Sequence, residues 1–119
     1  MFDLLLTDTV LDTDDEGLRH CIYEHQKVFA IFTTGDCAIC KLLDPGFVKL
    51  SENNEYQDIQ FVRLSSEENP VAKQLMAEQS APFFVSYCQG RILECDSLNT
   101  DADVLGQLNR LRAFTPTAE

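Results

Sequence analysis

Two spacings of apolar residues alternate along this chain and predict a protein built from alternating strands and helices. Runs rich in Val, Ile and Phe predict strands at 27–33, 58–64 and 81–88. The interior of the first run, residues 28–32, is apolar throughout, which is typical of a central strand covered on both faces. Gln89-Gly90 predicts a tight turn, after which residues 91–97 return as an antiparallel strand.

Apolar residues at helical spacing predict four helices between and after these strands. Asp14 is a good N-cap for the first helix, which extends to about residue 26, and Thr100 or Asp101 caps the last. The second helix runs from Cys37 to about residue 52, where we expect Pro45 to kink it, and the third covers 70–79. The residues predicted to face inward are Leu18, Ile22 and Cys21 or His25 in the first helix, Cys40, Leu43, Phe47 and Leu50 in the second, Val71, Leu75 and Met76 in the third, and Val104, Leu105, Leu108, Leu111 and Phe114 in the last.

The order of these elements is (β)αβαβαββα, with a strand or turn expected within residues 1–13. A βαβ unit followed by a hairpin and a closing helix implies an α/β fold with a mixed sheet and helices on both faces. The 119 residues are enough for one domain over 1–119. We place its core at about 14–114 and expect residues 115–119 to be a frayed tail.

Composition narrows the classes of function. Nine basic and twenty acidic residues give a net charge of −11, which disfavours binding to nucleic acid or to anionic membranes. No stretch approaches the roughly 18–20 apolar residues of a transmembrane helix. The first eight residues lack the positive start of a secretory signal, so we expect a cytoplasmic protein. Five cysteines in such a chain favour catalysis or metal binding over a structural disulfide framework.

Cys37 and Cys40 are the candidate functional residues. Their i, i+3 spacing on a helix places both side chains on one face, near enough to close a disulfide. Cys37 falls where unpaired N–H groups and the helix dipole favour an anion. That position lowers the pKa of a thiol and makes the reactive thiolate available near neutral pH. We interpret the pair as a dithiol–disulfide redox site.

Metal binding fits the sequence less well. A zinc site needs four ligands, and no second Cys or His pair has ligand spacing. The segment 12–17 resembles the front half of a calcium-binding loop, but Tyr23 stands where that loop needs a bidentate Glu. We interpret its acids as helix-capping residues, and His20, Cys21 and His25 as ordinary residues of the first helix. We therefore predict no metal site.

The remaining cysteines of the hairpin are predicted to be free. Under a two-residue turn, Cys88 faces Arg91 and Cys95 faces Phe84. The two sulfurs would then lie on the order of 13 Å apart along the sheet, too far for a disulfide. We expect both to be buried, small apolar residues.

With these elements placed, the chain resembles the thioredoxin family over roughly residues 14–114. The residues that carry the resemblance are Cys37-x-x-Cys40-Lys41 after a strand, Pro45 in the next helix, Asn69-Pro70, Pro82 before the hairpin and Gly90 in its turn. The resemblance implies the thioredoxin fold, with a central mixed sheet of four to five strands flanked by helices on both faces.

The resemblance also implies roles for individual residues. Cys37 matches the exposed nucleophile and Cys40 the buried resolving cysteine. Pro82 matches a proline that follows a cis peptide bond beside the Cys pair. Ala81 would offer its backbone N–H and C=O to an extended substrate segment. The substrate-binding residues implied in this way are Asp36, Ala38, Ile39, Ala81 and Pro82, and parts of Ser97-Leu98 would complete the apolar rim.

Several positions depart from the family pattern. Asp36 replaces the usual tryptophan and opposes ionisation of the neighbouring thiol. Ile31 replaces a buried aspartate that moves protons, while Arg63 keeps a positive charge where relatives often carry lysine. Ala38-Ile39 replaces Gly-Pro, two positions that tune the reduction potential in relatives, and Leu98 replaces a rim glycine.

The function that the resemblance implies is thiol–disulfide oxidoreduction in cell redox homeostasis. Its substrates would be protein disulfides or dithiols, and its electron donor a protein such as a thioredoxin reductase. It would act as a monomer with no cofactor other than its own redox-active disulfide. Two alternatives stay open: a thioredoxin-like binding module that docks an extended segment against Pro82, and a redox sensor with little turnover.

Overall fold

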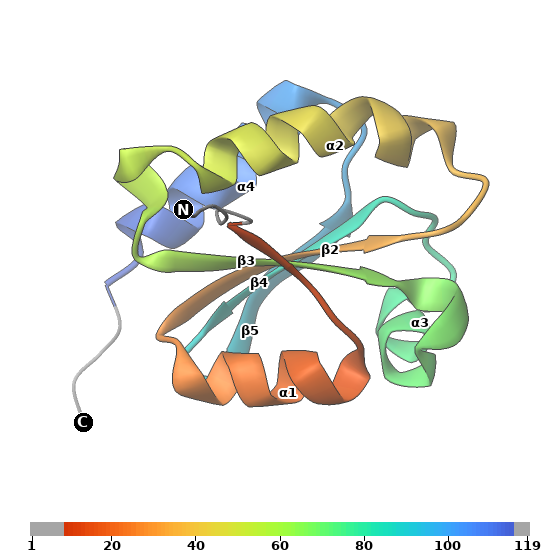
Figure 1. Cartoon of the computed structure of the whole chain (residues 1–119), viewed down its shortest axis with the longest axis horizontal. Coiled ribbons are helices and arrows are strands. Elements are labelled where there is room, and N and C mark those ends of the chain that lie inside the picture. Colours follow the sequence, from red (N-terminus) through yellow and green to blue (C-terminus); the bar gives the residue numbers. More distant parts are fainter. Residues whose placement is uncertain (1–8, 116–119) are drawn as a thin grey trace, which may run out of the picture.

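The computed structural model describes residues 9–115, and within them strands and helices follow each other in the predicted order (Figure 1). A strand or turn was expected within residues 1–13, and a short strand is found there at Val10–Asp12. Residues 1–8 and 116–119 lie outside the described part. The strands are β1 (Val10–Asp12), β2 (Lys27–Thr33), β3 (Ile59–Ser65), β4 (Phe83–Cys88) and β5 (Arg91–Ser97). The helices are α1 (Asp15–Glu24), α2 (Ala38–Ser51), α3 (Pro70–Met76) and α4 (Asp101–Ala113), with short 3-10 turns η2 (Asn54–Tyr56) and η3 (Ser66–Glu68).

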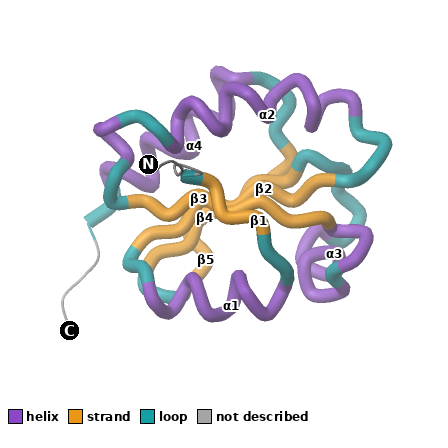
Figure 2. Tube along the Cα trace, viewed as in Figure 1, coloured by secondary structure: helices purple, strands orange, loops and turns teal. Residues whose placement is uncertain are grey.

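The five strands form one mixed sheet in the order β1-β3-β2-β4-β5. β1, β3 and β2 are parallel, whereas β4 is antiparallel to β2 and β5 to β4. The sheet separates two helical layers, with α2 and α4 on one face and α1 and α3 on the other (Figures 1 and 2). The predicted fold class, a mixed α/β sheet covered on both faces, is therefore confirmed.

Each face of the sheet has its own apolar core, because successive residues of β2 point to opposite faces. On the α2 and α4 side, Phe29, Phe47, Phe61 and Phe84 pack with ring centroids 5.3–6.2 Å apart. On the other side, Phe32 and its neighbours pack against α1 and α3. β2 is the central strand of the sheet, and the loop after its C-terminal end leads into α2.

Helix caps explain most of the helix boundaries. The Asp14 side chain accepts a hydrogen bond from Gly17 N at 2.9 Å, and Thr100 accepts one from Asp103 N at 3.1 Å. Thr100, not Asp101, is therefore the cap of α4. Pro45 lies inside α2, which continues to Ser51. The kink expected there stays a prediction.

Three predictions of burial in the helices were wrong. Val71 is 64% exposed, because α3 begins at Pro70 and its register turns Ala72 and Met76 inward. Leu105 is also exposed, and Gln107 takes the inward position, where its amide donates a 2.9 Å hydrogen bond to Ser86 Oγ. The third error lies at a helix end, where Phe114 is the exposed C-cap of α4. Of the alternatives Cys21 and His25 in the first helix, Cys21 is the buried residue, and His25 is the exposed C-cap of α1. Ile22, Leu50 and Leu75 are partly exposed but pack against the cores, so they face inward as predicted.

The hairpin differs from its predicted register by one residue. Gln89 and Gly90 both have positive φ, as a tight two-residue turn requires, and Cys88 pairs with Arg91 as predicted. A bulge then leaves Leu93 unpaired, so Cys95 lies opposite Val85 and not opposite Phe84. Cys88 is buried and Cys95 is exposed, and both are free thiols as predicted. The expectation that Cys95 is buried was wrong.

Candidate functional site

Cys37 and Cys40 lie at the start of α2 and are joined by a disulfide. Their Cα atoms are 5.2 Å apart, within the range of about 4.4–6.8 Å usual for disulfides. Cys37 is the N-cap residue, so the helix proper begins one residue later than predicted. Cys37 is partly exposed, whereas Cys40 is buried beneath it. An exposed first sulfur and a buried second one give a partner access to Cys37 alone.

The backbone of α2 points a donor at the first sulfur. Cys40 N donates a hydrogen bond to Cys37 Sγ at 3.0 Å, and Lys41 N donates to the Cys37 carbonyl at 3.3 Å. The first N–H groups of a helix have no partner within the helix, so a side chain at the cap satisfies them. A thiolate at the same place would accept the same hydrogen bond more strongly, because it carries a full charge.

The loop before Cys37 is held by a residue that the sequence did not single out. Gly35 N donates to Glu67 Oε1 at 3.0 Å, and Ser66 Oγ donates to the Thr33 carbonyl at 3.1 Å. Both partners come from η3, in a segment predicted only as a polar link. No local pattern could identify them, since each contact spans more than thirty residues of sequence.

Pro82 lies immediately before β4, and its peptide bond with Ala81 is cis. Pro82 is buried, and its carbonyl accepts a hydrogen bond from Leu98 N at 3.3 Å. Ser97 Oγ donates to the Ser80 carbonyl at 2.5 Å, so the loop before Pro82 is attached to the end of β5. Ala81 is partly exposed.

A groove of about 560 Å³ connects the Cys pair with this loop. Four of the five predicted substrate-binding residues line it together with Cys37, and Pro82 adjoins it through Ala81. Cys40 is not part of the lining. The lining residues are Thr34, Asp36, Cys37, Ala38, Ile39, Ser66, Glu67, Lys73, Met76, Ala77, Gln79, Ser80 and Ala81.

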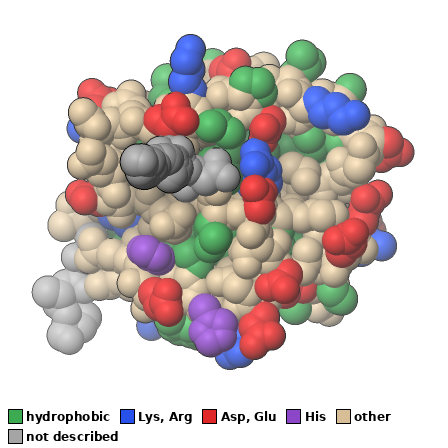
Figure 3. Space-filling view, viewed as in Figure 1, with side chains coloured by type: hydrophobic (Ala, Val, Ile, Leu, Met, Phe, Trp, Pro, Cys, Tyr) green, Lys and Arg blue, Asp and Glu red, His purple; other side chains and the backbone are tan. Residues whose placement is uncertain are grey.

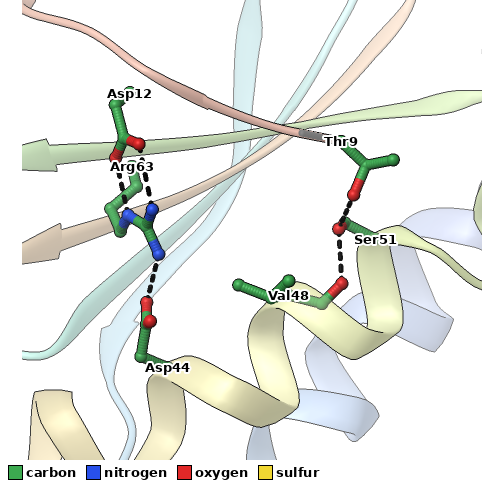
Figure 4. A network of polar contacts seen from close by, with 6 residues as sticks. All are labelled: Thr9, Asp12, Asp44, Val48, Ser51 and Arg63. Atoms are coloured by element: carbon green, nitrogen blue, oxygen red, sulfur yellow. Dashed lines mark hydrogen bonds and ion pairs between the residues drawn. The ribbon is translucent and has the colours of Figure 1, made fainter. Parts of the chain in front are cut away.

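Arg63 belongs to a network of ion pairs beside the site (Figure 4). Its Nε and Nη2 atoms donate to the two carboxylate oxygens of Asp12 at 2.6 and 2.9 Å, and Nη1 donates to Asp44 of α2. The hydrogen bond with Asp12, and then that with Asp44, raises the pKa of the guanidinium against the opposing effect of burial. Ile31, which pairs with Arg63 across the sheet, is fully buried among apolar side chains.

A second contact in Figure 4 attaches the residue before β1 to the end of α2. Ser51 Oγ donates to the Val48 carbonyl at 2.5 Å and also bonds Thr9 Oγ1. Together with Arg63, this contact fixes both ends of β1 against the layer that carries the Cys pair.

Other potential sites are weaker. Within residues 9–115, no group of three or more His, Cys, Asp or Glu side chains is arranged to hold a metal ion. In the same range, no helix is both long enough and apolar enough to cross a membrane. Cys21 is buried in the α1 layer, where burial and then the charge of Glu24 raise the pKa of its thiol.

Comparison with known proteins identifies the fold. No protein-family model matches the sequence, and no curated protein matches it either. Solved structures do match. The thioredoxin of Malassezia sympodialis (Mala s 13) has a TM-score of 0.80 at 17% identity, covering 94% of this chain and 98% of its own. Thioredoxin f from spinach chloroplast, in its short form, has a TM-score of 0.79 at 18% identity, covering 93% and 100%. Mitochondrial thioredoxin 3 of Saccharomyces cerevisiae has a TM-score of 0.76 at 20% identity, covering 87% and 96%.

The chain is therefore an α/β protein with the thioredoxin fold. The resemblance stated from the sequence is confirmed, because the structural neighbours are thioredoxins and the Cys37–Cys40 pair lies at disulfide distance. Within this fold, the Cys-x-x-Cys pair lies at a helix N-terminus and is closed as a disulfide, which is an arrangement that permits thiol–disulfide exchange.

Proposed function

We propose that this protein reduces or exchanges disulfides in partner proteins through the Cys37–Cys40 dithiol. The observation that carries the proposal is the placement of the pair. One sulfur is accessible from a groove, the other is buried beneath it, and a helix N–H points at the accessible one. Asp36, Ala38, Ile39, Ala81 and Pro82 would form the surface on which the partner segment lies.

The chemistry needs two successive exchanges. The Cys37 thiolate attacks one sulfur of the partner disulfide, and the other partner sulfur leaves as a thiolate and takes up a proton. Cys40, once deprotonated, then attacks Cys37 Sγ, so the mixed disulfide breaks and the Cys37–Cys40 disulfide forms. The dithiol has given two electrons to the partner. A second dithiol, such as that of a thioredoxin reductase, returns them.

The environment of Cys37 contains opposing influences on the thiolate. The Cys40 N–H and the start of α2 stabilise a negative charge on the sulfur. The carboxylate of Asp36, the preceding residue, destabilises it by like-charge repulsion. Titration of the thiolate absorbance in the wild type and in Asp36→Ala measures the second effect. An unchanged Cys37 pKa would remove Asp36 from this account.

Ala81 supports the substrate side of the proposal. It lines the groove with Cys37 and immediately precedes Pro82, so its backbone can pair with an extended segment whose sulfur reaches Cys37. We further propose that the protein works in the cytoplasm as a monomer, in redox homeostasis, and that its own disulfide is its only redox group.

Insulin reduction with dithiothreitol as the electron donor tests the proposal. We expect Cys37→Ser to abolish the catalysed rate, and Cys95→Ser, which changes an exposed thiol outside the groove, to retain it. Equal rates for the wild type and Cys37→Ser would instead favour a module that binds extended segments without exchange.

One observation keeps a redox sensor as a second candidate. Ile31 is fully buried and apolar, so it cannot accept the proton of the resolving thiol. A slow second exchange would favour a lasting disulfide over turnover. A sensor would show normal closure of Cys37–Cys40 and a change in partner binding, with insulin reduction near the uncatalysed rate.

A further inference from the structure

The groove beside Cys37 carries two carboxylates near the reactive sulfur. Asp36 is the residue immediately before Cys37, and Glu67 reaches from η3 to accept the hydrogen bond of Gly35 N at 3.0 Å. Both side chains are exposed to solvent and both line the groove. An incoming segment therefore meets two negative charges close to the atom that it must reach.

The cation of the groove does not cancel these charges. Lys73 of α3 is the lining residue with a positive charge, and among the ion pairs of residues 9–115 it contacts neither Asp36 nor Glu67. Lys41, the other cation close in sequence, is exposed on α2 and outside the groove lining. The lining of the groove, with two carboxylates and one ammonium group, thus carries one net negative charge.

Asp36 and Glu67 are the acids of the groove lining, and the other acids of residues 9–115 lie outside it. The net charge is −11, and on the face shown in Figure 3 acidic side chains are scattered among basic ones. Charges in water are largely screened beyond a Debye length of about 8–10 Å. Acids far from the groove therefore contribute little at Cys37, whereas carboxylates in the same groove are screened less.

Resting on the proposed function, we propose that this groove selects disulfides that carry positive charge next to the sulfur attacked by Cys37. The matching partner is a protein segment with lysine or arginine adjacent to its cysteine. Asp36 and Glu67 attract a cation next to the partner's cysteine and repel an anion at the same position. In water, one unit charge about 6 Å away changes a rate about threefold.

The test uses three small disulfides of similar length and different charge. These are dicationic cystamine, neutral 2-hydroxyethyl disulfide and dianionic 3,3′-dithiodipropionate. The fully reduced protein is mixed with each, and formation of the Cys37–Cys40 disulfide is followed by acid quench, alkylation and intact mass. The exchange balances as described above, since each probe leaves as two thiols.

The variants remove charge and keep shape. Glu67→Gln retains a side-chain oxygen that can accept the hydrogen bond from Gly35 N, and Asp36→Asn is nearly isosteric. The control is Glu52→Gln at the C-cap of α2, which removes one negative charge as each single variant does. Fourteen helical residues at about 1.5 Å each place it on the order of 20 Å from Cys37.

The result expected is a preference of the wild type for cystamine over dithiodipropionate. That rate ratio should fall about threefold or more in each single variant, fall further in the double variant, and stay unchanged in Glu52→Gln. A change in the thiolate pKa affects all three probes alike, so it cancels in the ratio.

Two results separate the possible failures. The charge selection alone would be overturned if the neutral probe reacts at a normal rate but the ratio of the cystamine rate to the dithiodipropionate rate does not depend on these carboxylates. That is the case if the double variant leaves the ratio unchanged, or if Glu52→Gln lowers it as much as the groove variants do. Failure of the neutral probe to form the Cys37–Cys40 disulfide would overturn both this inference and the proposed function.

Discussion

Replacing Arg63 with methionine tests whether the ion-pair network beside the Cys pair is structural or redox-active. The change removes the guanidinium and keeps an unbranched apolar stem of similar length. It breaks the two-pronged contact with Asp12 of β1 and the contact with Asp44 of α2. The variant therefore lacks the charged contact that joins β1, β3 and α2.

The size of the effect follows from the exposure of the partners. The side chains of Asp12 and Asp44 are 59% and 40% exposed, so solvent screens both pairs. A two-pronged Arg–carboxylate contact lies at the upper end of the surface range, about 1 kcal/mol, and the second pair adds less. We expect Arg63→Met to lower the free energy of unfolding by about 1–2 kcal/mol, well below the roughly 3–5 kcal/mol of a broken buried pair.

Urea unfolding of the oxidised and the reduced protein measures this loss in both redox states. If Arg63 only joins strands and helix, both states lose the same free energy and the reduction potential of Cys37–Cys40 is unchanged. If Arg63 acts on the sulfurs, the two losses differ, and about 1.4 kcal/mol of difference appears as about 30 mV. Arg91→Met is the control, because Arg91 is exposed and makes no ion pair among residues 9–115.

Two outcomes would refute this reasoning. One is a loss no larger than that of Arg91→Met, which would mean that the network contributes no measurable stability. The other is a shift in the reduction potential of about 30 mV or more, which would make Arg63 part of the redox site.

Three further predictions test the cores and the remaining cysteines. Phe47→Ala should lower the free energy of unfolding by about 3–5 kcal/mol in urea titration, because Phe47 is 1% exposed and contacts three other rings. Native oxidised protein should be alkylated at exposed Cys95 and not at buried Cys21 or Cys88 until it unfolds, as intact mass will show. Burial raises the pKa of the Tyr87 hydroxyl, so its contribution to stability is complete below the unfolded value of about 10 and is lost as the pH rises above it. Tyr87→Phe should therefore flatten the alkaline fall of the unfolding free energy, and an unchanged slope would contradict the assignment.

Patterns that depend on neighbours in sequence were predicted well. The strand at 27–33 matches β2 residue for residue, because an uninterrupted apolar run has only one stable place, at the centre of a covered sheet. Asp14 and Thr100 cap their helices through contacts three residues away. The Cys37–Cys40 disulfide likewise depends on one turn of one helix.

Single-residue choices of register were predicted less well. The bulge at Leu93 moves Cys95 from the partner position of Phe84 to that of Val85, and no feature of the turn announces it. In α3, Val71 and Ala72 are both acceptable inward residues, and the start of the helix at Pro70 decides between them. Seven residues give too short a pattern for the apolar spacing to decide alone.

The electrostatics of the site could not be predicted, because they depend on residues that meet only in the folded chain. From sequence, Arg63 appeared as a positive charge near the Cys pair. In the fold its charge is matched by Asp12 and Asp44, which lie 51 and 19 residues away in sequence. Glu67, in contrast, enters the groove from a segment with no distinguishing pattern.

These two placements change the electrostatic picture of Cys37. With the charge of Arg63 matched by its partners and with Ile31 apolar, neither of the positions that assist the thiol in the family pattern is available to do so here. What can favour the thiolate is the N–H of Cys40 at the start of α2, and what opposes it is Asp36, with Glu67 adding negative charge to the same groove. Under the proposed charge selection, the carboxylates that oppose formation of the thiolate are also the ones that attract a cationic partner. Such a site would give up reactivity toward disulfides in general and gain selectivity for those that bring a positive charge.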